Sequence, residues 1–141
     1  MIIDSHCHAW TYWPYNHPVP DPTTRGRVEQ LLNEMDLGDI DKAVIICAQI
    51  DHNPENNAYI AEVAAQHADR LYQFPDVDCS WSTTYHIPGA ADRLRSIAQR
   101  WPIKGFTHYL RHEDNGDWLD SEEGRAFFQV AVDFNLIASI A

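Results

Sequence analysis

Residues 43–48 read Ala-Val-Ile-Ile-Cys-Ala, an apolar run without the alternation that a half-exposed strand shows. A strand covered on both faces has this pattern, because neither face meets water. The run therefore predicts a buried strand of a parallel sheet. Parallel strands are joined by crossover connections, usually helices, so the flanking sequence decides whether an α/β fold is present.

Apolar residues recur at helical spacing on both sides of this run. In four segments they stand at i, i+3, i+4 and i+7, so each segment has one apolar face and predicts an amphipathic helix. The four stripes, in chain order, are Val28, Leu31, Leu32 and Met35; Ile60, Val63, Ala64 and His67; Leu94, Ile97, Ala98 and Trp101; and Phe127, Val130, Ala131 and Phe134.

Residues near the ends of these stripes are typical of helix caps. Thr24 can accept hydrogen bonds from the first free amide groups of the first helix, and Gly38 can end that helix. The second helix is expected to have Asn53 as its N-cap and Pro54 at its first position. Ser121 is expected to open the last helix.

Four more short segments complete the strand pattern. Their centres lie near Ile3, Gln73, Gly105 and Ala138, about one strand-helix-strand unit apart along the chain. Five strands and four helices in strict alternation predict an α/β fold with a parallel sheet. No Gly/Ser linker, charge run or low-complexity tract divides residues 1–141, which are expected to form a single domain.

The composition narrows the expected partners. The 141 residues include 21 acidic and 10 basic side chains, so the formal net charge is −11. Nucleic acid and acidic membrane surfaces attract clustered Lys and Arg, so neither is expected to bind this chain. The expected partner is a small-molecule substrate, and a homo-oligomer is possible. No segment resembles a membrane span or a secretory signal, so a cytoplasmic location is expected.

The segment Asp4-Ser5-His6-Cys7-His8 carries the strongest signal for chemistry, because it ends the first expected strand. Side chains two apart point to the same face of a strand, so Asp4, His6 and His8 are expected on one side. Two imidazoles so placed can bind one metal ion, and parallel α/β folds hold ligands at the carboxyl ends of strands. The alternative is that both are ordinary hydrogen-bonded histidines at a strand end, although burying such a pair without partners is costly.

Two stretches carry a resemblance to a known family. Residues 3–10, Ile-Asp-Ser-His-Cys-His-Ala-Trp, resemble the opening of the amidohydrolase superfamily, in particular its lactonase-like amidohydrolase-2 branch. Residues 103–110, Ile-Lys-Gly-Phe-Thr-His-Tyr-Leu, followed by Asp-Trp-Leu at 117–119, resemble the fourth strand and acidic loop of the same branch. Thr107 stands where that branch usually has an arginine, so Arg111 is the nearby residue that could contact a substrate carboxylate instead.

The resemblance implies a (β/α)8 TIM barrel of which these residues are the amino-terminal half. A complete barrel needs about 200–250 residues, whereas this sequence reaches only its fifth expected strand. His6 and His8 are the implied ligands of a divalent ion, Zn or alternatively Mn, and later strands would supply the other ligands and the base. The chain is therefore expected to belong to a longer enzyme and to be inactive alone, with a stand-alone half-barrel as the alternative.

The implied activity is metal-assisted hydrolysis of a lactone or of a related ester or amide. The alternatives are decarboxylation by the same fold and a non-catalytic half-barrel that acts as an interaction module. Candidate substrate-binding residues are Trp10 and Tyr12, in an aromatic loop suited to a ring-shaped substrate, and His108 and Arg111, after the fourth expected strand. An ordinary loop or packing role is the alternative for each of the four. No catalytic residue is assigned.

The other reactive residue types are not expected to carry function. The three cysteines cannot all pair and have no C-x-x-C spacing, so a reduced, inert state is expected for them. One of the remaining histidines, His67, is expected at a helix end. The residues left without a functional role are Cys7, Cys47, Cys79, His17, His52, His67, His86 and His112.

Overall fold

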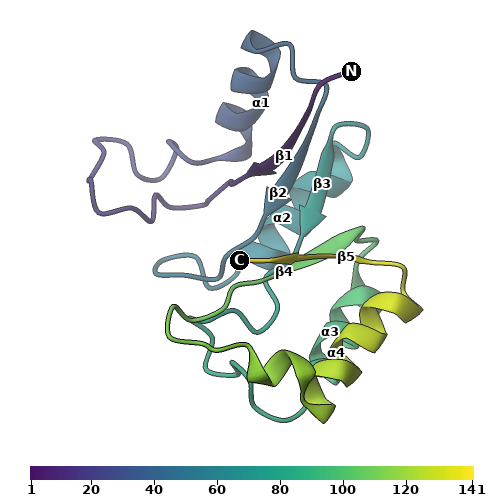
Figure 1. The fold of residues 1–141 in the computed structure, drawn as a ribbon. Coiled ribbons are helices and arrows are strands. Elements are labelled where there is room, and N and C mark those ends of the chain that lie inside the picture. Colours follow the sequence, from purple (N-terminus) through teal and green to yellow (C-terminus); the bar gives the residue numbers. More distant parts are fainter. The chain divides into compact units, whose positions relative to one another are not determined.

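The predicted alternation of strands and helices is present in the computed structural model, which describes all 141 residues (Figure 1). The elements are β1 (Ile3–Cys7), α1 (Val28–Leu37), β2 (Lys42–Ile46), α2 (Asn56–Gln66), β3 (Leu71–Phe74), α3 (Ala90–Arg100), β4 (Gly105–His108), the 3-10 helix η1 (Asp117–Asp120), α4 (Glu122–Asp133) and β5 (Ile137–Ile140). All strand pairs are parallel, and the expected α/β fold, half of a TIM barrel, is confirmed.

The chain divides into two compact units, Met1–Phe74 and Pro75–Ala141. In the first unit, β2 lies between β1 and β3 in a three-stranded sheet. The apolar run that predicted the fold is the central strand, and the side chains of Ala43 and Ile45 are completely buried. They pack with Met35 of α1 and with Ile60 of α2. The pairing of β1 with β2 is irregular between Asp4 and Cys7, where β1 approaches its carboxyl end.

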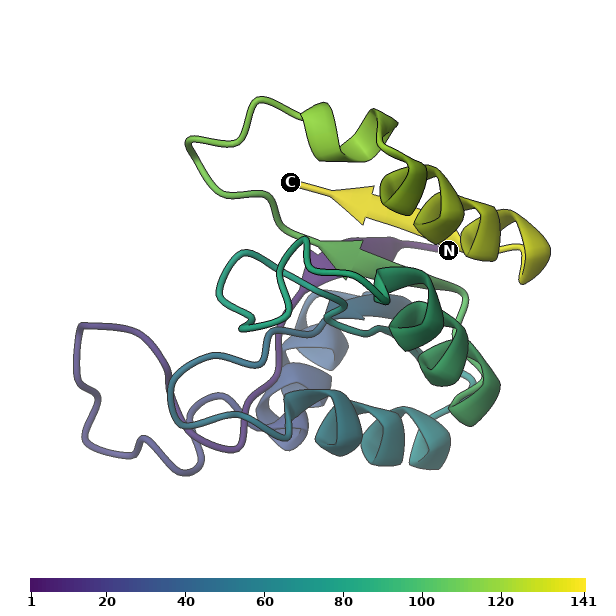
Figure 2. The ribbon, with the colours of Figure 1, turned by 90° about the horizontal axis from the view of Figure 1, so that it is seen from below.

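The second unit is built around β4, which pairs with β5. Residues 75–77 run beside β4 as well, because the Thr107 N–H donates to the Pro75 carbonyl at 2.9 Å and the Val77 N–H donates to the Thr107 carbonyl at 3.0 Å. Helices α3 and α4 run side by side, as Figures 1 and 2 both show. Phe106 of β4 and Phe127 of α4 meet edge to face within this core, with their ring centroids 5.2 Å apart. The single domain expected over residues 1–141 stays a prediction.

Two helix starts differ from the prediction. Helix α1 has Arg27 at its N-cap, and the Thr24 hydroxyl instead donates to the Asp21 carbonyl in the preceding turns. Helix α2 starts at Asn56 with Glu55 as its N-cap, because the side chain of Asn53 is engaged with the loop after β1. Neither side chain caps its helix, because Thr24 bonds within a local turn and Asn53 bonds to a distant loop.

The other two predicted caps are confirmed. The Gly38 N–H donates to the Glu34 carbonyl at the end of α1. The Ser121 hydroxyl accepts from the Gly124 N–H at 3.0 Å at the start of α4. Gly124 is required there, because a Cβ at this position would overlap the carbonyl of Trp118 in η1. None of the helices combines the length and the apolar character that a membrane-spanning helix needs.

Candidate functional site

His6 and His8 lie together at the carboxyl end of β1. Their ring centroids are 5.1 Å apart and the rings meet edge to face, with an interplanar angle of 84°. His6 is exposed and His8 is partly buried. The Asp4 carboxylate accepts the His6 backbone N–H at 3.0 Å, which stabilises the backbone that presents the first ring. The two imidazoles are therefore close enough to act on one bound atom.

One contact fixes the tautomer of His8. Its Nδ1 lies 2.7 Å from the Ile46 carbonyl of β2. A carbonyl oxygen only accepts, so the hydrogen is on Nδ1 and the lone pair is on Nε2. Burial lowers the pKa of His8, and the adjacent His6 lowers it further, against the opposing effect of the Ile46 hydrogen bond. His8 is thus a neutral imidazole with an oriented Nε2, which is the form that binds a metal ion.

These residues fit part of a metal site. A histidine ligand usually donates its second ring nitrogen to a carbonyl or carboxylate, and the contact between His8 and Ile46 is of that kind. Two imidazoles supply half of a four-ligand set. The structure has no group of three or more His, Cys, Asp or Glu side chains that could hold a metal ion.

Two buried asparagines hold the loop that follows β1. The Asn56 side chain donates to the Ala9 carbonyl at 2.9 Å and accepts from the Ala48 N–H at 3.0 Å. Asn53 accepts from the backbone N–H of Tyr12 and donates to the Tyr12 carbonyl. The loop after β1 is thereby tied to the loop after β2. Sequence reasoning assigned Asn53 to a helix cap and gave Asn56 no role, because neither pairing is local.

The two aromatic residues predicted to bind substrate occupy different surroundings in this loop. Trp10 is only 3% exposed and lies against His8, with ring centroids 5.4 Å apart and an interplanar angle of 22°. It lines a pocket of about 230 Å³ together with His8 and Arg25. Tyr12 lines a second pocket, of about 360 Å³, with Trp13, Tyr15 and His52 among its other walls. Their contact with a substrate stays a prediction.

The carboxyl end of β4 carries the other two predicted substrate-binding residues. His108 is completely buried, whereas Arg111 is exposed. The guanidinium of Arg111 lies 4.6 Å from the centroid of the Tyr85 ring, and the Arg111 backbone N–H donates to the Tyr85 hydroxyl at 3.0 Å. Arg111 forms no ion pair with a carboxylate, so its charge is available to an anion. The substrate role of both residues stays a prediction.

Sequence reasoning missed the groups that surround His108. His86 faces it, with the two Nε2 atoms 3.2 Å apart, and Asp114 lies beside His86. These residues come from the connection before α3, from β4 and from the loop before η1, so no spacing in the sequence links them. The Asp-Trp-Leu motif at 117–119 was the nearest signal, since its Trp118 stacks on His86 at a centroid distance of 4.1 Å.

Two of the three cysteines, Cys7 and Cys79, are unsuited to nucleophilic chemistry. Burial raises the pKa of the Cys7 thiol to about 12, and Asp4 adds to this effect. Burial likewise raises the pKa of the Cys79 thiol, which accepts the Tyr109 N–H and is completely enclosed. Thiols held in this way stay protonated at neutral pH and are poor nucleophiles.

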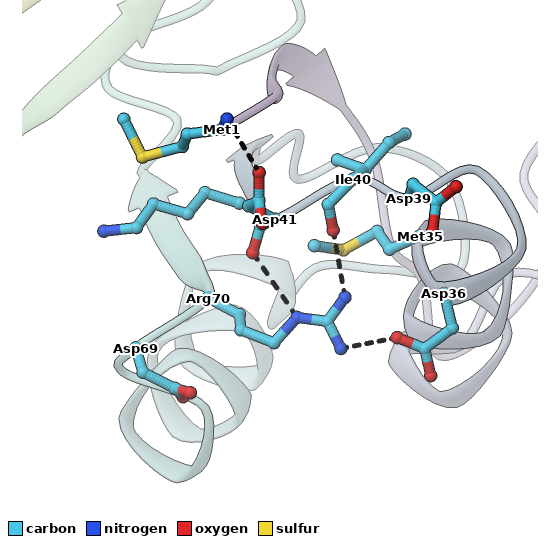
Figure 3. Close-up of a pocket in the computed structure, with 9 residues that line it drawn as sticks. Met1, Met35, Asp36, Asp39, Ile40, Asp41, Asp69 and Arg70 are labelled. Carbon is cyan, nitrogen blue, oxygen red and sulfur yellow. Dashed lines mark hydrogen bonds and ion pairs between the residues drawn. The ribbon is translucent and has the colours of Figure 1, made fainter.

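A wide hollow of about 710 Å³ lies at the opposite, amino ends of the strands in the first unit (Figure 3). Several of its charged groups contact one another. Arg70 contacts the Asp36 carboxylate at 2.7 Å and the Ile40 carbonyl at 3.0 Å, and the amino-terminal nitrogen of Met1 lies 3.6 Å from Asp41. Ligands of TIM barrels bind at the carboxyl face, so this hollow is assigned a structural role.

No family model matches the chain, and no curated protein matches it. Solved structures match it over 99% of its length. They include a probable 2-pyrone-4,6-dicarboxylic acid hydrolase from Acinetobacter baumannii with citric acid bound, at 16% identity and a TM-score of 0.63. A protein from Staphylococcus aureus described as a candidate amidohydrolase matches at 15% identity and a TM-score of 0.67. A 5-carboxyvanillate decarboxylase from Novosphingobium aromaticivorans, with bound manganese and a substituted nitrobenzoic acid, matches at 18% identity and a TM-score of 0.66.

The chain spans about half the length of these structures, with 48%, 46% and 50% of their chains covered. At this level of identity the likeness shows the fold alone: the chain folds like half of a TIM barrel. Fold alone does not fix a reaction, which depends on the residues at the site.

Proposed function

We propose that the chain is the amino-terminal half of an amidohydrolase-2 type hydrolase that opens a lactone or a related ester or amide with the help of a divalent ion. The observation that carries this proposal is the His6–His8 pair at the carboxyl end of β1, with His8 oriented by the Ile46 carbonyl. The resemblance of residues 3–10 and 103–110 to that branch, and the fold of the solved neighbours, support it.

His6 and His8 would hold the ion, Zn or alternatively Mn, together with ligands that these 141 residues do not supply. When bound, such an ion lowers the pKa of a water ligand to about 7 and polarises a carbonyl oxygen. Other residues of this chain would hold His8 in the orientation that binds the ion. The Ile46 carbonyl keeps the lone pair of His8 on Nε2, and the enclosed ring of Trp10 holds the His8 imidazole in its plane.

The substrate would be a ring compound with an anionic group. Tyr12 and its neighbours offer an aromatic wall in a pocket of about 360 Å³. Arg111, fixed by the Tyr85 ring and without a carboxylate partner, would bind the anion. Thr107 stands where the resembling branch usually has an arginine, so Arg111 would take the place of that arginine. His108 is completely buried, so it would lie behind the Arg111 contact and not at the surface that meets the substrate.

Two alternative functions each have an observation in their favour. Decarboxylation is supported by the neighbour that is a 5-carboxyvanillate decarboxylase. A non-catalytic interaction module is supported by exposed apolar side chains on one edge strand of each unit, Ile3 on β1 and Ile137 and Ile140 on β5. Because an outer strand leaves unpaired backbone groups, such edges can add a strand from another chain.

Metal content tests the site. The chain is titrated with Zn²⁺ and with Mn²⁺ and compared with a variant carrying His6→Ala and His8→Ala. A matched control carries His17→Ala and His67→Ala, which removes two histidines of the same unit away from the site. We expect weak binding to the wild type and the control and none to the His6/His8 variant, since half a ligand set binds weakly. Equal binding by all three proteins would show that His6 and His8 are not ligands.

Product analysis distinguishes the reactions. The 141-residue chain and the polypeptide encoded by the complete reading frame are supplied with lactones and with aromatic carboxylates. We expect no turnover by the chain alone, and proton release from lactones by the complete polypeptide that is abolished by His6→Ala. Release of CO₂ from the carboxylates would favour the decarboxylase. Turnover that His6→Ala leaves unchanged would contradict the site, and a stable inactive dimer of the chain would favour the interaction module.

A further inference from the structure

The second unit holds a cluster of rings around His108, and the proposed hydrolase does not use the contact between His108 and His86. His86 stacks between Tyr85 and Trp118, at centroid distances of 3.7 Å and 4.1 Å, and faces the buried His108. The backbone of His86 has φ of 55°, in the left-handed region that non-glycine residues rarely adopt. A strained backbone persists only where surrounding contacts hold it, so the position of His86 is imposed by its neighbours.

The hydrogen on one nitrogen of His108 can be assigned. Nδ1 of His108 lies 3.0 Å from the Val77 carbonyl, which only accepts. Nδ1 therefore carries a hydrogen, and in the neutral ring Nε2 carries the lone pair.

The same reasoning applies to His86. Its Nδ1 lies 3.3 Å from an oxygen of the Asp114 carboxylate. Hydrogen bonds from the Tyr85 hydroxyl and the Gly116 N–H lower the pKa of Asp114, so it is ionised near neutral pH. A lone pair on Nδ1 would face this anion, whereas an N–H is attracted to it. The hydrogen of a neutral His86 therefore also belongs on Nδ1.

These assignments leave two lone pairs facing each other. The Nε2 atoms are 3.2 Å apart and the ring centroids are 5.4 Å apart. The difference between these distances is about twice the distance from the centre of an imidazole ring to one of its atoms, so both nitrogens lie close to the line that joins the two centroids. The rings therefore meet head-on and are tilted by only 25°. Two nitrogens that bind one metal ion direct their lone pairs at a common point to the side of the line between them, whereas these two lone pairs point at each other along that line. A single N–H···N hydrogen bond fits this geometry.

We propose that His86 and His108 bind one proton between their Nε2 atoms and act as a single proton-binding site, with the Asp114 carboxylate as its counterion. The site goes beyond the proposed hydrolase, in which His108 lies behind the Arg111 contact. When the proton is bound, it joins the connection before α3 to the end of β4. When the proton leaves, the two lone pairs repel each other and this contact opens.

The surroundings set the range in which the proton binds. Burial lowers the pKa of His86, Asp114 raises it, and His108 and Arg111 lower it again. Asp78 also raises it, but the Asp78 carboxylate is already engaged with Arg93 at 2.7 Å. Tyr85 remains a neutral donor, because burial raises its pKa to about 12. The net direction for His86 is downward, so this ring takes up its proton on the acid side of the ordinary pKa of histidine.

Nitrogen NMR of the eight histidines tests the proposal directly. Two rings should titrate together in one step, with both Nδ1 atoms protonated throughout and only the Nε2 signals changing. In Asp114→Asn the midpoint should fall by about one pH unit or more, because the counterion is lost. In His86→Gln the joint step should vanish. The matched control Glu113→Gln removes an exposed carboxylate of the same loop and should leave the step in place.

A second readout does not depend on resonance assignment. A protonated imidazole stacked on an indole quenches the fluorescence of the indole. The fluorescence intensity of Trp118 should therefore decrease as the pair is protonated. This component should be lost in Trp118→Phe and retained in Trp101→Phe, which removes a tryptophan elsewhere in the same unit. Circular dichroism identifies any variant that fails to fold, and Asp114→Asn then carries the test because it keeps both rings. Independent titration of His86 and His108, or Nδ1 signals that change with pH, would overturn the proposal.

Discussion

The molecule holds two histidine pairs, one in each unit, and they differ in nearly every physical respect. His6 and His8 are two residues apart, and the first of them is exposed. His86 and His108 are 22 residues apart, and the second is completely buried. The first pair is made by the geometry of one strand. The second exists only because separate segments fold against each other.

The two pairs therefore suit different roles, ligand binding for His6 and His8 and stabilisation of the fold for His86 and His108. The exposed ring of His6 and the oriented Nε2 of His8 suit a ligand that arrives from solution. The buried pair has its nitrogens committed to Val77, to Asp114 and to each other, so it serves the fold around it. The exposure of His6 and the oriented Nε2 of His8 favour binding chemistry, whereas the buried contacts of the second pair favour a structural role, because a buried polar group without a partner is costly.

The largest expected effect is a contrast in stability between the two pairs. His108→Ala should lower the free energy of unfolding by about 3 kcal/mol, because it leaves a cavity beside Phe127 and removes the partner of the Val77 carbonyl. His6→Ala should change it by less than about 0.5 kcal/mol, as exposed substitutions usually do. Urea denaturation measures both, with the exposed His112→Ala as control. Similar losses in His6→Ala and His108→Ala would remove the distinction.

A smaller loss is expected where Asn56 joins the loops after β1 and β2. Asn56→Ala should cost about 2 kcal/mol, because the Ala9 carbonyl and the Ala48 N–H lose their buried partner. Hydrogen exchange of the Ala48 amide should accelerate along with the drop in stability. The exposed α1 variant Asn33→Ala serves as the matched control. Unchanged exchange at Ala48 would mean that Asn56 does not hold the loop that carries His8.

A still smaller effect is expected at the amino ends of the strands. Arg70→Ala should cost about 1 kcal/mol, through its contacts with the Asp36 carboxylate and the Ile40 carbonyl. Metal binding at His6 and His8 should be unaffected, because these contacts lie at the opposite end of the sheet. Arg95→Ala, which breaks an exposed pair with Asp92, should cost almost nothing. Loss of metal binding in Arg70→Ala would contradict the division of roles between the two ends.

The smallest effect is confined to acid pH. The Tyr85 hydroxyl lowers the pKa of Asp114 from its ordinary value of 3.8 in the unfolded chain. A carboxyl group with a lowered folded-state pKa stabilises the protein above the unfolded pKa, and this contribution is lost as the pH falls through the folded value. Below about pH 4, Asp114→Asn should therefore lose stability less steeply than the wild type. Parallel acid denaturation curves for the two proteins would show that Asp114 is not stabilised by folding.

Much of the architecture could be predicted because it follows from local chemistry. The unbroken run at 43–48 became the buried central strand β2, and four stripes at helical spacing became four helices. The His6–His8 pair was equally accessible, since residues two apart on a strand meet without help from the rest of the chain. Gly38 and Ser121 cap their helices as expected, because both caps involve only neighbouring backbone.

The tertiary structure decided every feature that depends on distant partners. Asn53 left its predicted cap because the Tyr12 backbone competes for its amide, and Asn56 became a buried link between two loops. The pairing of His86 with His108 and Asp114 leaves no periodic trace, since three separate segments supply the three side chains. Periodicity records which face of an element is buried. It does not record which distant polar group will form a hydrogen bond with a buried nitrogen. The tertiary contacts of the folded chain determine that partner.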